Sequence, residues 1–208
     1  MGRSYPHRTP ARLLPSRPFA AAVFMLAFTA LLYVLEFVDL TGGQSLSKSE
    51  CIVPRQPDRL ADVLIAPLLH AGWWHVNSNA LGFLLFGFLA MAAGIGRFIA
   101  VTVIVWLVSG LGVWLIAPSN SCTVGASGVI FGWLMYLLFR GFFNRSARQI
   151  LLAVVLLVLW GGVLWGLLPG QPGVSWQAHL FGAIGGILAA RMMAKLDRRR
   201  PEEPVMPR

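Results

Sequence analysis

Six stretches of this chain are rich in Leu, Val, Ile, Phe and Ala and almost free of charged residues. They cover residues 18–38, 68–93, 98–117, 124–139, 150–168 and 176–190. A helix needs about 20 apolar residues to cross the hydrocarbon core of a bilayer, and backbone exposed to lipid must satisfy its hydrogen bonds internally. The pattern therefore predicts an all-α integral membrane protein, a bundle of six transmembrane helices in one domain at residues 18–194.

The composition agrees with a membrane protein and excludes other classes. Of the 208 residues, 57% are hydrophobic and 12% are charged, whereas a soluble domain has about 25% charged residues. Two cysteines are too few for a disulfide-rich scaffold, and so apolar a chain is not disordered. No A-x-A-like cleavage site follows the first stretch, so we interpret it as a retained anchor helix and not as a cleaved signal peptide.

The distribution of basic residues predicts the orientation. The chain has 17 Lys and Arg against 8 acidic residues, a net charge of +9. If six spans alternate, all of these basic residues except Lys48, Arg55 and Arg59 fall on one side, together with a basic N-terminal tail at 1–17 and a basic, Pro-containing C-terminal tail at 195–208. The positive-inside rule then makes both termini cytoplasmic. The charge fits topology and attraction to anionic membrane lipid, and needs no nucleic-acid partner. The preference for Arg over Lys indicates a bacterial source, hence a multi-pass protein of the bacterial plasma membrane.

Polar side chains interrupt three of the six stretches. His70, His75 and Asn79 lie in the second, Ser127 opens the fourth, and His179 lies near the start of the sixth. Such residues are costly inside a membrane and are functional candidates. In an alternating topology these three stretches run in the same direction, so we expect the polar residues to meet at one depth, in the outer half of the bundle.

Small residues predict which helices touch. Ala178, Gly182, Gly186 and Ala190 recur every four residues along the sixth stretch, and Gly128 and Gly132 do the same along the fourth. Such ladders let helix backbones approach closely in lipid. We therefore expect the fourth helix to pack against the sixth, which would bring Ser127 within hydrogen-bond range of His179.

This set of residues is typical of nucleophilic catalysis. A serine hydroxyl is a weak nucleophile unless a nearby base takes its proton, and His179 could be that base. Ser127 opens a helix, whose free N–H groups could stabilise an oxyanion, and the side chains of Asn79 and His75 could add donors. Because Glu36 is the one acidic residue in the outer half of the predicted spans, we expect a Ser-His dyad without a catalytic acid.

Three motifs together resemble those of the rhomboid family of intramembrane serine proteases. In chain order they are H-x4-H-x3-N from His70 to Asn79, G-A-S-G from Gly125 to Gly128, and A-H-x2-G-x3-G from Ala178 to Gly186. Their order and spans match the family over about residues 60–190. The resemblance implies a six-helix rhomboid-type bundle that needs no cofactor and cuts transmembrane protein substrates near the outer membrane face. It also implies that Ser127 attacks, His179 is the general base, and His75 and Asn79 stabilise the oxyanion.

Two positions depart from the family pattern. Leu60-Ala61-Asp62 stands where some bacterial relatives have a Trp-Arg pair in the first loop, so the internal packing of that loop cannot be inferred from the family. Phe131 stands where several relatives have a tyrosine. It lies four residues after Ser127, on the same helix face, so we expect its ring to pack against His179 and support its orientation.

Other interpretations remain open at this point. Ser127, His179, His75 and Asn79 could be polar residues that only join helices, as such side chains do in membranes. His70 could brace the first loop without touching substrate, and Gly182 and Gly186 serve packing in either case. A rhomboid-like protein that binds membrane clients without cutting them is the main alternative. A small transporter and a histidine metal site are disfavoured, because the chain lacks a buried carboxylate pathway and an HExxH motif.

Cys51 and Cys122 are the two cysteines of the chain. The predicted topology puts both in outer connections, away from the reducing cytosol. A disulfide between them would tie the long first loop to the entrance of the site. Spacing alone does not establish such a bridge, and the pair could instead be two unrelated small apolar residues.

Overall fold

The computed structural model describes residues 12–199, and within them every regular element is helical. The two predicted basic tails, 1–17 and 195–208, therefore lie largely outside the described residues. Six long helices match the six apolar stretches. They are α1 (Pro18–Thr41), α3 (Trp73–Ala90), α4 (Ile95–Ile116), α5 (Ser127–Asn144), α6 (Ala147–Trp160) and α7 (Trp176–Arg199). Shorter pieces are α2 (Ser45–Ser49) and the 3₁₀ segments η1 (Pro57–Leu64), η2 (Ala66–Leu68), η3 (Met91–Ala93) and η4 (Gly161–Leu167).

Some helix ends differ from the apolar stretches for local reasons. The second stretch was expected from residue 68, but α3 begins at Trp73, because Gly72 has a positive φ of 120° that a helix cannot contain. The fourth was expected from residue 124, but α5 begins at Ser127, directly after Gly125, whose φ is 119°. Helix α7 continues beyond residue 190 to Arg199. Both glycines lie next to predicted site residues, so the turns they permit also shape the site.

Within residues 12–199, four helical segments are long and apolar enough to cross a membrane: Pro18–Thr41, Trp73–Ala93, Ile95–Ile116 and Ala147–Leu167. Helices α5 and α7 are not among them. Helix α5 contains Arg140 and Asn144, and the last turns of α7 are charged. Most of α5 is buried by its neighbours, with Trp133 and Leu137 fully inaccessible, so its surroundings are protein more than lipid. The chain is thus an integral, multi-pass membrane protein.

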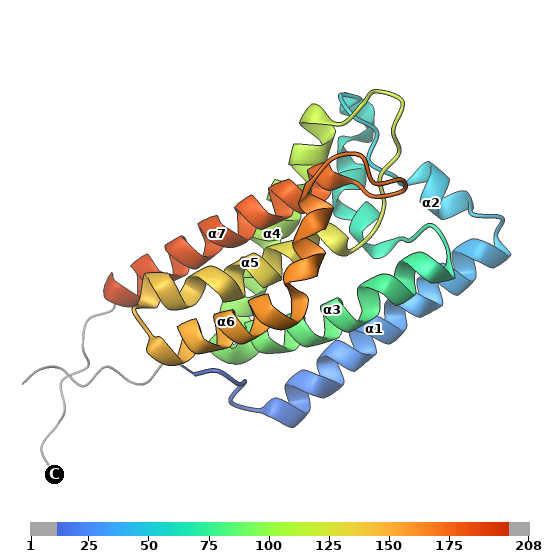
Figure 1. The fold of residues 1–208 in the computed structure, drawn as a ribbon. Coiled ribbons are helices and arrows are strands. Elements are labelled where there is room, and N and C mark those ends of the chain that lie inside the picture. Colours follow the sequence, from blue (N-terminus) through green and yellow to red (C-terminus); the bar gives the residue numbers. More distant parts are fainter. Residues whose placement is uncertain (1–11, 200–208) are drawn as a thin grey trace, which may run out of the picture.

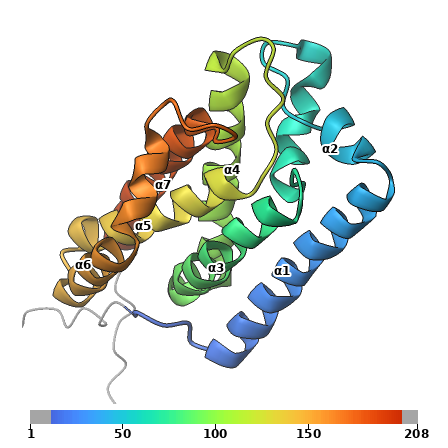
Figure 2. The same cartoon turned by 45° about the vertical axis from the view of Figure 1, so that its right-hand side comes forward.

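Helix α5 is the centre of the bundle (Figure 1). It contacts α3, α4, α6 and α7, while α1 packs along the far side of α3 (Figure 2). Residue 12 and the end of α7 lie at the same end of the bundle, and the loops that precede α5 and α7 lie at the other (Figure 1). We call this second end the site end.

Glycines bring α5 and α7 together, as their spacing predicts. A Cβ atom added to Gly182 would collide with the carbonyl oxygen of Gly128, and one added to Gly186 would collide with that of Gly132. Contacts this close are possible only where neither helix presents a side chain. The ladder thus fixes the first turn of α5 against the first turns of α7.

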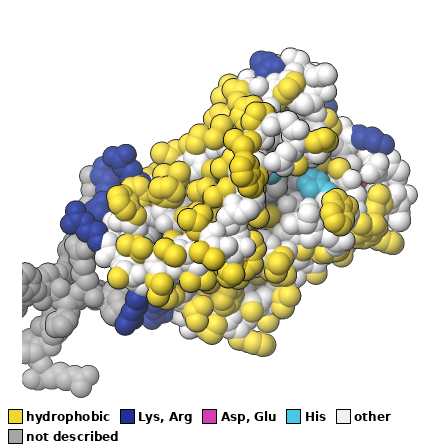
Figure 3. Space-filling model, in the orientation of Figure 1, with side chains coloured by type: hydrophobic (Ala, Val, Ile, Leu, Met, Phe, Trp, Pro, Cys, Tyr) yellow, Lys and Arg dark blue, Asp and Glu magenta, His cyan; other side chains and the backbone are white. Residues whose placement is uncertain are grey.

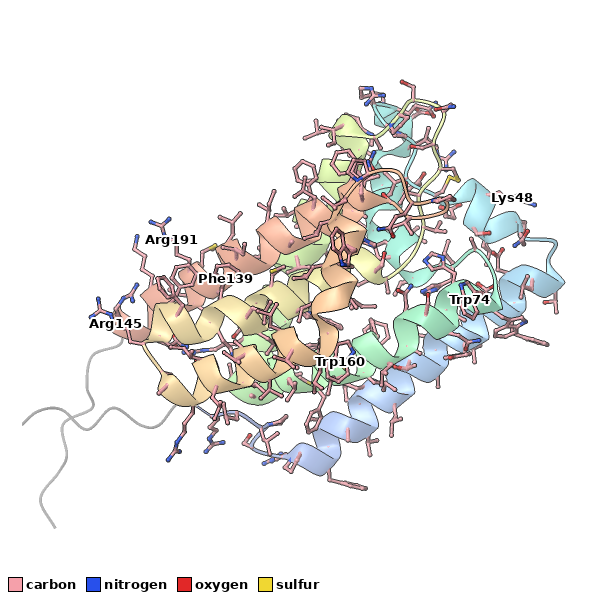
Figure 4. All side chains as sticks on the ribbon, viewed as in Figure 1. Lys48, Trp74, Phe139, Arg145, Trp160 and Arg191 are labelled. Carbon is pink, nitrogen blue, oxygen red and sulfur yellow. A yellow bond between two sulfur atoms is a disulfide. The ribbon has the colours of Figure 1, made fainter. Side chains whose placement is uncertain are left out.

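The two ends of the bundle differ in charge. Arg145 and Arg191 lie at the end where α5 and α7 finish, whereas Lys48 and Trp74 lie at the site end (Figure 4). Blue side chains gather beside the end of α7 in the space-filling view, which also shows histidine in a hollow nearer the site end (Figure 3). Arg97, in the first turn of α4, pairs with Asp197 near the end of α7. This asymmetry agrees with the distribution of basic residues that the sequence predicts for the two sides of the membrane.

Candidate active site

Ser127 is presented by a glycine-containing turn at the start of α5. The loop before it is fixed by backbone hydrogen bonds: Ile52 and Thr123 exchange two, of 3.0 and 3.2 Å, and the N–H of Gly125 donates to the carbonyl of Ala66 at 3.0 Å. The left-handed φ of Gly125, 119°, then turns the chain into the helix. Ser127 is therefore the first residue of α5, beside backbone N–H groups that have no partner within the helix.

His179 lies in the first turn of α7 and is only 7% exposed. Its ring stacks on Phe131 of α5, with ring centroids 4.0 Å apart and an angle of 10° between the planes. Its Nδ1 atom lies 2.8 Å from the carbonyl oxygen of Gly166 in η4. The packing of Phe131 against His179 that the sequence predicts is thus present, and the ring is held from two directions.

Ser127 and His179 line the same cavity, which has a volume of about 360 Å³. Asn79 and Phe131 line it as well. The remaining lining residues come mainly from α3, η4 and the loop before α7, and are mostly apolar: Ser78, Leu81, Gly82, Phe86, Ile130, Trp160, Gly162, Val163, Trp165, Gly166, Gln171 and Val174. Three of the four residues with expected chemistry therefore meet in one space.

The expected hydrogen bond between Ser127 and His179 is not among those of residues 12–199. The two helices are nevertheless packed by their glycine ladders, as expected. Hydrogen bonds between catalytic groups are often long or poorly aligned before substrate binds, and tighten in the reacting complex. Ser127 and His179 therefore line one cavity without the hydrogen bond through which a proton would pass between them.

Asn79 and His75 differ in their relation to the cavity. The amide nitrogen of Asn79 is buried and has no hydrogen-bond partner among the described residues, so this donor is available to a ligand. His75 does not line the cavity. It lies close to the turn that precedes Ser127, because a Cβ atom added to Gly125 would be 2.7 Å from Nε2 of His75. The N–H of Ala71 donates to Nδ1 of His75 at 3.3 Å. The neutral ring then carries its hydrogen on Nε2, as a donor beside this turn.

Comparison with known proteins identifies the family. The sequence matches the Rhomboid domain over residues 57–196. The chain belongs to the rhomboid family. It is 42% identical over 202 residues to an uncharacterized protein of Mycobacterium tuberculosis, covering 92% of this chain and 84% of that protein. It is 41% identical over 191 residues to an uncharacterized protein of Mycobacterium leprae, with 88% and 75% covered. It is 32% identical over 143 residues to YdcA of Bacillus subtilis, provisionally named a rhomboid protease, with 66% and 69% covered.

His70 sits behind the site of this rhomboid. It lies in the loop before α3, is 1% exposed, and contacts the His75 ring edge-on, with centroids 5.0 Å apart. Burial, together with the charge that His75 would carry, lowers the pKa of His70 to about 3. The ring is therefore neutral at ordinary pH. It does not line the cavity, which favours a role in bracing His75 and the first loop over contact with substrate.

Cys51 and Cys122 form a disulfide, with Cα atoms 5.3 Å apart. The bridge joins the loop after α2 to the loop before α5, beside the paired backbone of Ile52 and Thr123. Ser127 follows five residues after Cys122 in the sequence. The disulfide therefore ties the first loop to the segment that leads into the site.

The first loop of this rhomboid has its own set of polar contacts. Arg59 forms an ion pair with Asp62 at 2.6 Å and also donates to the carbonyls of Ser49 and Cys51. Arg55 donates to the carbonyl of Ala117 at 2.8 Å. These two arginines fold the loop around the disulfide, in a part of the chain where the sequence offered no family pattern to follow.

Two residues at the site were missed from the sequence. Ser109 in α4 donates to the carbonyl of Ala178 at 2.9 Å, directly before His179. A small polar residue in a largely apolar helix was the available signal. Gly166 contributes its carbonyl oxygen to His179. A backbone group has no sequence signature, and only the glycine itself could have drawn attention to the position.

Proposed function

We propose that this rhomboid is an intramembrane serine endopeptidase that cleaves transmembrane protein substrates near the outer membrane face. The observation that carries the proposal is the meeting of Ser127, His179 and the unpartnered amide of Asn79 at one cavity. Each comes from a different helix, so no local packing requirement explains their convergence. A protein that only bound clients would need neither the nucleophile nor the base.

The proposed reaction is acyl transfer through a covalent intermediate. Nε2 of His179 takes the hydroxyl proton of Ser127 as the oxygen attacks the scissile carbonyl. The leaving amine then receives that proton from His179, which leaves an ester on Ser127. Water attacks the ester with His179 again as base, releasing the carboxylate product and restoring the hydroxyl.

The developing oxyanion has several donors within reach of the site. The free N–H groups at the start of α5 carry the positive end of the helix dipole. The side-chain amide of Asn79 and the Nε2–H of His75 add neutral donors. Donors fixed in advance stabilise a developing charge more than mobile water does, because they need no reorganisation during the reaction.

The topology proposed for this activity has six spans with both termini in the cytoplasm, and a membrane domain covering residues 18–194. Helices α5 and α7 would cross inside the bundle, shielded by their neighbours. The basic end of the molecule would then face the cytoplasm and anionic lipid, and the site end would face outward. A bacterial plasma membrane fits the bacterial relatives.

The test is labelling by a fluorophosphonate, which reacts with activated serines, on protein in detergent or lipid. Wild type is expected to be labelled and Ser127→Ala to remain unlabelled. Ser121→Ala is the matched control, because Ser121 lies in the loop before α5 and outside the cavity. This variant keeps Ser127 and is expected to be labelled like wild type. Release of membrane-protein fragments by cells carrying each variant tests cleavage itself. A well-folded wild type that neither labels nor cleaves would contradict the proposal and favour the client-binding alternative.

A further inference from the structure

The carbonyl oxygen of Gly166 takes the position at His179 that a carboxylate occupies in a catalytic triad. It lies 2.8 Å from Nδ1, on the opposite side of the ring from Nε2. It belongs to η4, whereas Ser127 and His179 belong to α5 and α7. We propose that Gly166 is a positioning residue whose backbone carbonyl fixes the tautomer and rotation of the His179 ring. The inference rests on the proposed function, in which His179 is the base.

The identity of the acceptor determines which ring nitrogen carries the hydrogen. A carbonyl oxygen has lone pairs and no hydrogen, so it can only accept. At 2.8 Å the contact is a hydrogen bond only if Nδ1 of His179 donates. A neutral imidazole has one N–H, so Nε2 is left with a free lone pair. This is the tautomer that can take a proton from Ser127.

The bond supplies an orientation that stacking cannot. Phe131 holds the plane of the His179 ring, but a stacked ring can still flip by half a turn about its Cβ–Cγ bond, which leaves that plane unchanged. Such a flip would put ring carbons at the positions now held by Nε2 and Nδ1. The Gly166 bond distinguishes the two orientations, because only one of them places Nδ1 against the carbonyl. The two contacts together leave one productive arrangement.

The absence of a side chain at position 166 is required by this geometry. A Cβ atom on Gly166 would lie 2.9 Å from Nδ1 of His179 and 3.1 Å from Cζ of Phe131, both closer than ordinary contacts. The φ of Gly166 is not positive, so alanine could adopt its backbone conformation. Gly161, at the start of η4, offers a contrast. A Cβ there would meet Leu157 at 3.7 Å, an ordinary contact, and Gly161 does not line the cavity.

The decisive measurement is the protonation of the His179 ring nitrogens, read by nitrogen NMR on ¹⁵N-histidine-labelled protein in lipid. Full-length wild type and Ser127→Ala are the samples, with His179→Gln used to assign the signals. Near neutral pH we expect a protonated Nδ1 and an unprotonated Nε2. A protonated Nε2, or rapid exchange between both forms, would overturn the proposal. This readout does not depend on cleavage, so it stays valid if the proposed activity fails.

The matched variants Gly166→Ala and Gly161→Ala test the consequence. We expect Gly166→Ala to slow fluorophosphonate labelling of Ser127 by about tenfold or more, because small displacements of a catalytic group are costly. Its Nδ1–H signal is expected to shift or split. Gly161→Ala is expected to label at the wild-type rate with unchanged signals. A purely structural role would lower the thermal stability of Gly166→Ala with its imidazole signals unchanged, and that result would also overturn the proposal.

Discussion

His179 and His75 both lie near the start of α5, and their Nδ1 atoms contact opposite kinds of backbone group. We call their surroundings the His179 side and the His75 side. Nδ1 of His179 faces a carbonyl oxygen, that of Gly166, whereas Nδ1 of His75 faces an N–H group, that of Ala71. The first contact places the hydrogen on Nδ1 and the second places it on Nε2. One ring is thereby prepared to accept a proton and the other to donate a hydrogen bond.

The two sides also differ in how they are built. The His179 side consists of α7, η4 and the stacked ring of Phe131, held by close packing without a covalent link. The His75 side consists of the start of α3 and the loops around the turn at Gly125, held by backbone pairing and by the disulfide. In the proposed dyad, which has no acid, main-chain groups would supply the orientation that a carboxylate gives in a triad.

Loss of the base is expected to have the largest effect. His179→Ala is expected to abolish fluorophosphonate labelling and cleavage as completely as Ser127→Ala, since the two would act as one unit. The double variant is then no worse than either single one. Rates of fragment release measured for all three variants check this. Losses that multiply would show that the two residues act independently.

On the donor side a smaller loss is expected. Asn79→Asp keeps the size of the side chain but replaces the unpartnered N–H donor with an acceptor, and His75→Ala removes the donor near Gly125. A single oxyanion donor contributes about 3 to 4 kcal/mol when it acts alone, and less where several share the charge. Turnover is expected to fall in both variants while thermal stability changes little. Unchanged turnover in both would assign these residues to packing.

Variants of Phe131 test the stacking contact of His179 separately from its contact with Gly166. Phe131→Ala removes the ring that lies 4.0 Å from the imidazole, so we expect a clear loss of activity together with a loss of stability from the cavity it leaves. Phe131→Tyr keeps the ring and is expected to retain more activity. Cleavage rates, corrected for the folded fraction, measure the difference. The reverse order would mean that the hydroxyl found in several relatives matters more than the ring.

The sequence predicts the helices and their main contact better than the details of the site. The packing of α5 against α7 could be predicted from glycine spacing, because a close approach of two helices requires small residues in register. The glycines are Gly128 and Gly132 in α5 and Gly182 and Gly186 in α7. The contribution of Gly166 could not be predicted. Its chemistry is that of a carbonyl group, which every residue has, and only the path of η4 brings this one to the imidazole.

The start of α3 and the first loop show the same limit. Apolar residues before Trp73 extend the hydrophobic stretch, but α3 starts only at Trp73 because of the positive φ of Gly72. A hydropathy pattern contains no information about φ. In the first loop, Arg59 bonds to main-chain carbonyls at Ser49 and Cys51. Long-range contacts between a side chain and irregular backbone depend on the folded path of the loop, so pattern alone could not reveal them.

The smallest effect on activity is expected from the disulfide, which joins two loops on the His75 side. Its loop spans a sequence separation of 71 residues. The chain-entropy model gives about 4 kcal/mol for such a loop, an upper value here because the membrane already restricts the unfolded chain. Replacing both Cys51 and Cys122 by alanine is therefore expected to lower the thermal stability clearly. The site itself keeps its backbone pairing at Ile52 and Thr123, so Ser127 is expected to label only a few-fold more slowly.

The same variant can show whether the two sides are independent. If they are, the double alanine variant loses protection from hydrogen exchange in the loops around Gly125, while the Nδ1–H signal of His179 stays as in wild type. The bridge joins segments that precede α3 and α5 and not η4 or α7, so its removal is expected to leave the Gly166 carbonyl in place. A shift of the His179 signal in this variant would mean that the loop before α5 helps to hold the base, and that the two sides form a single coupled structure.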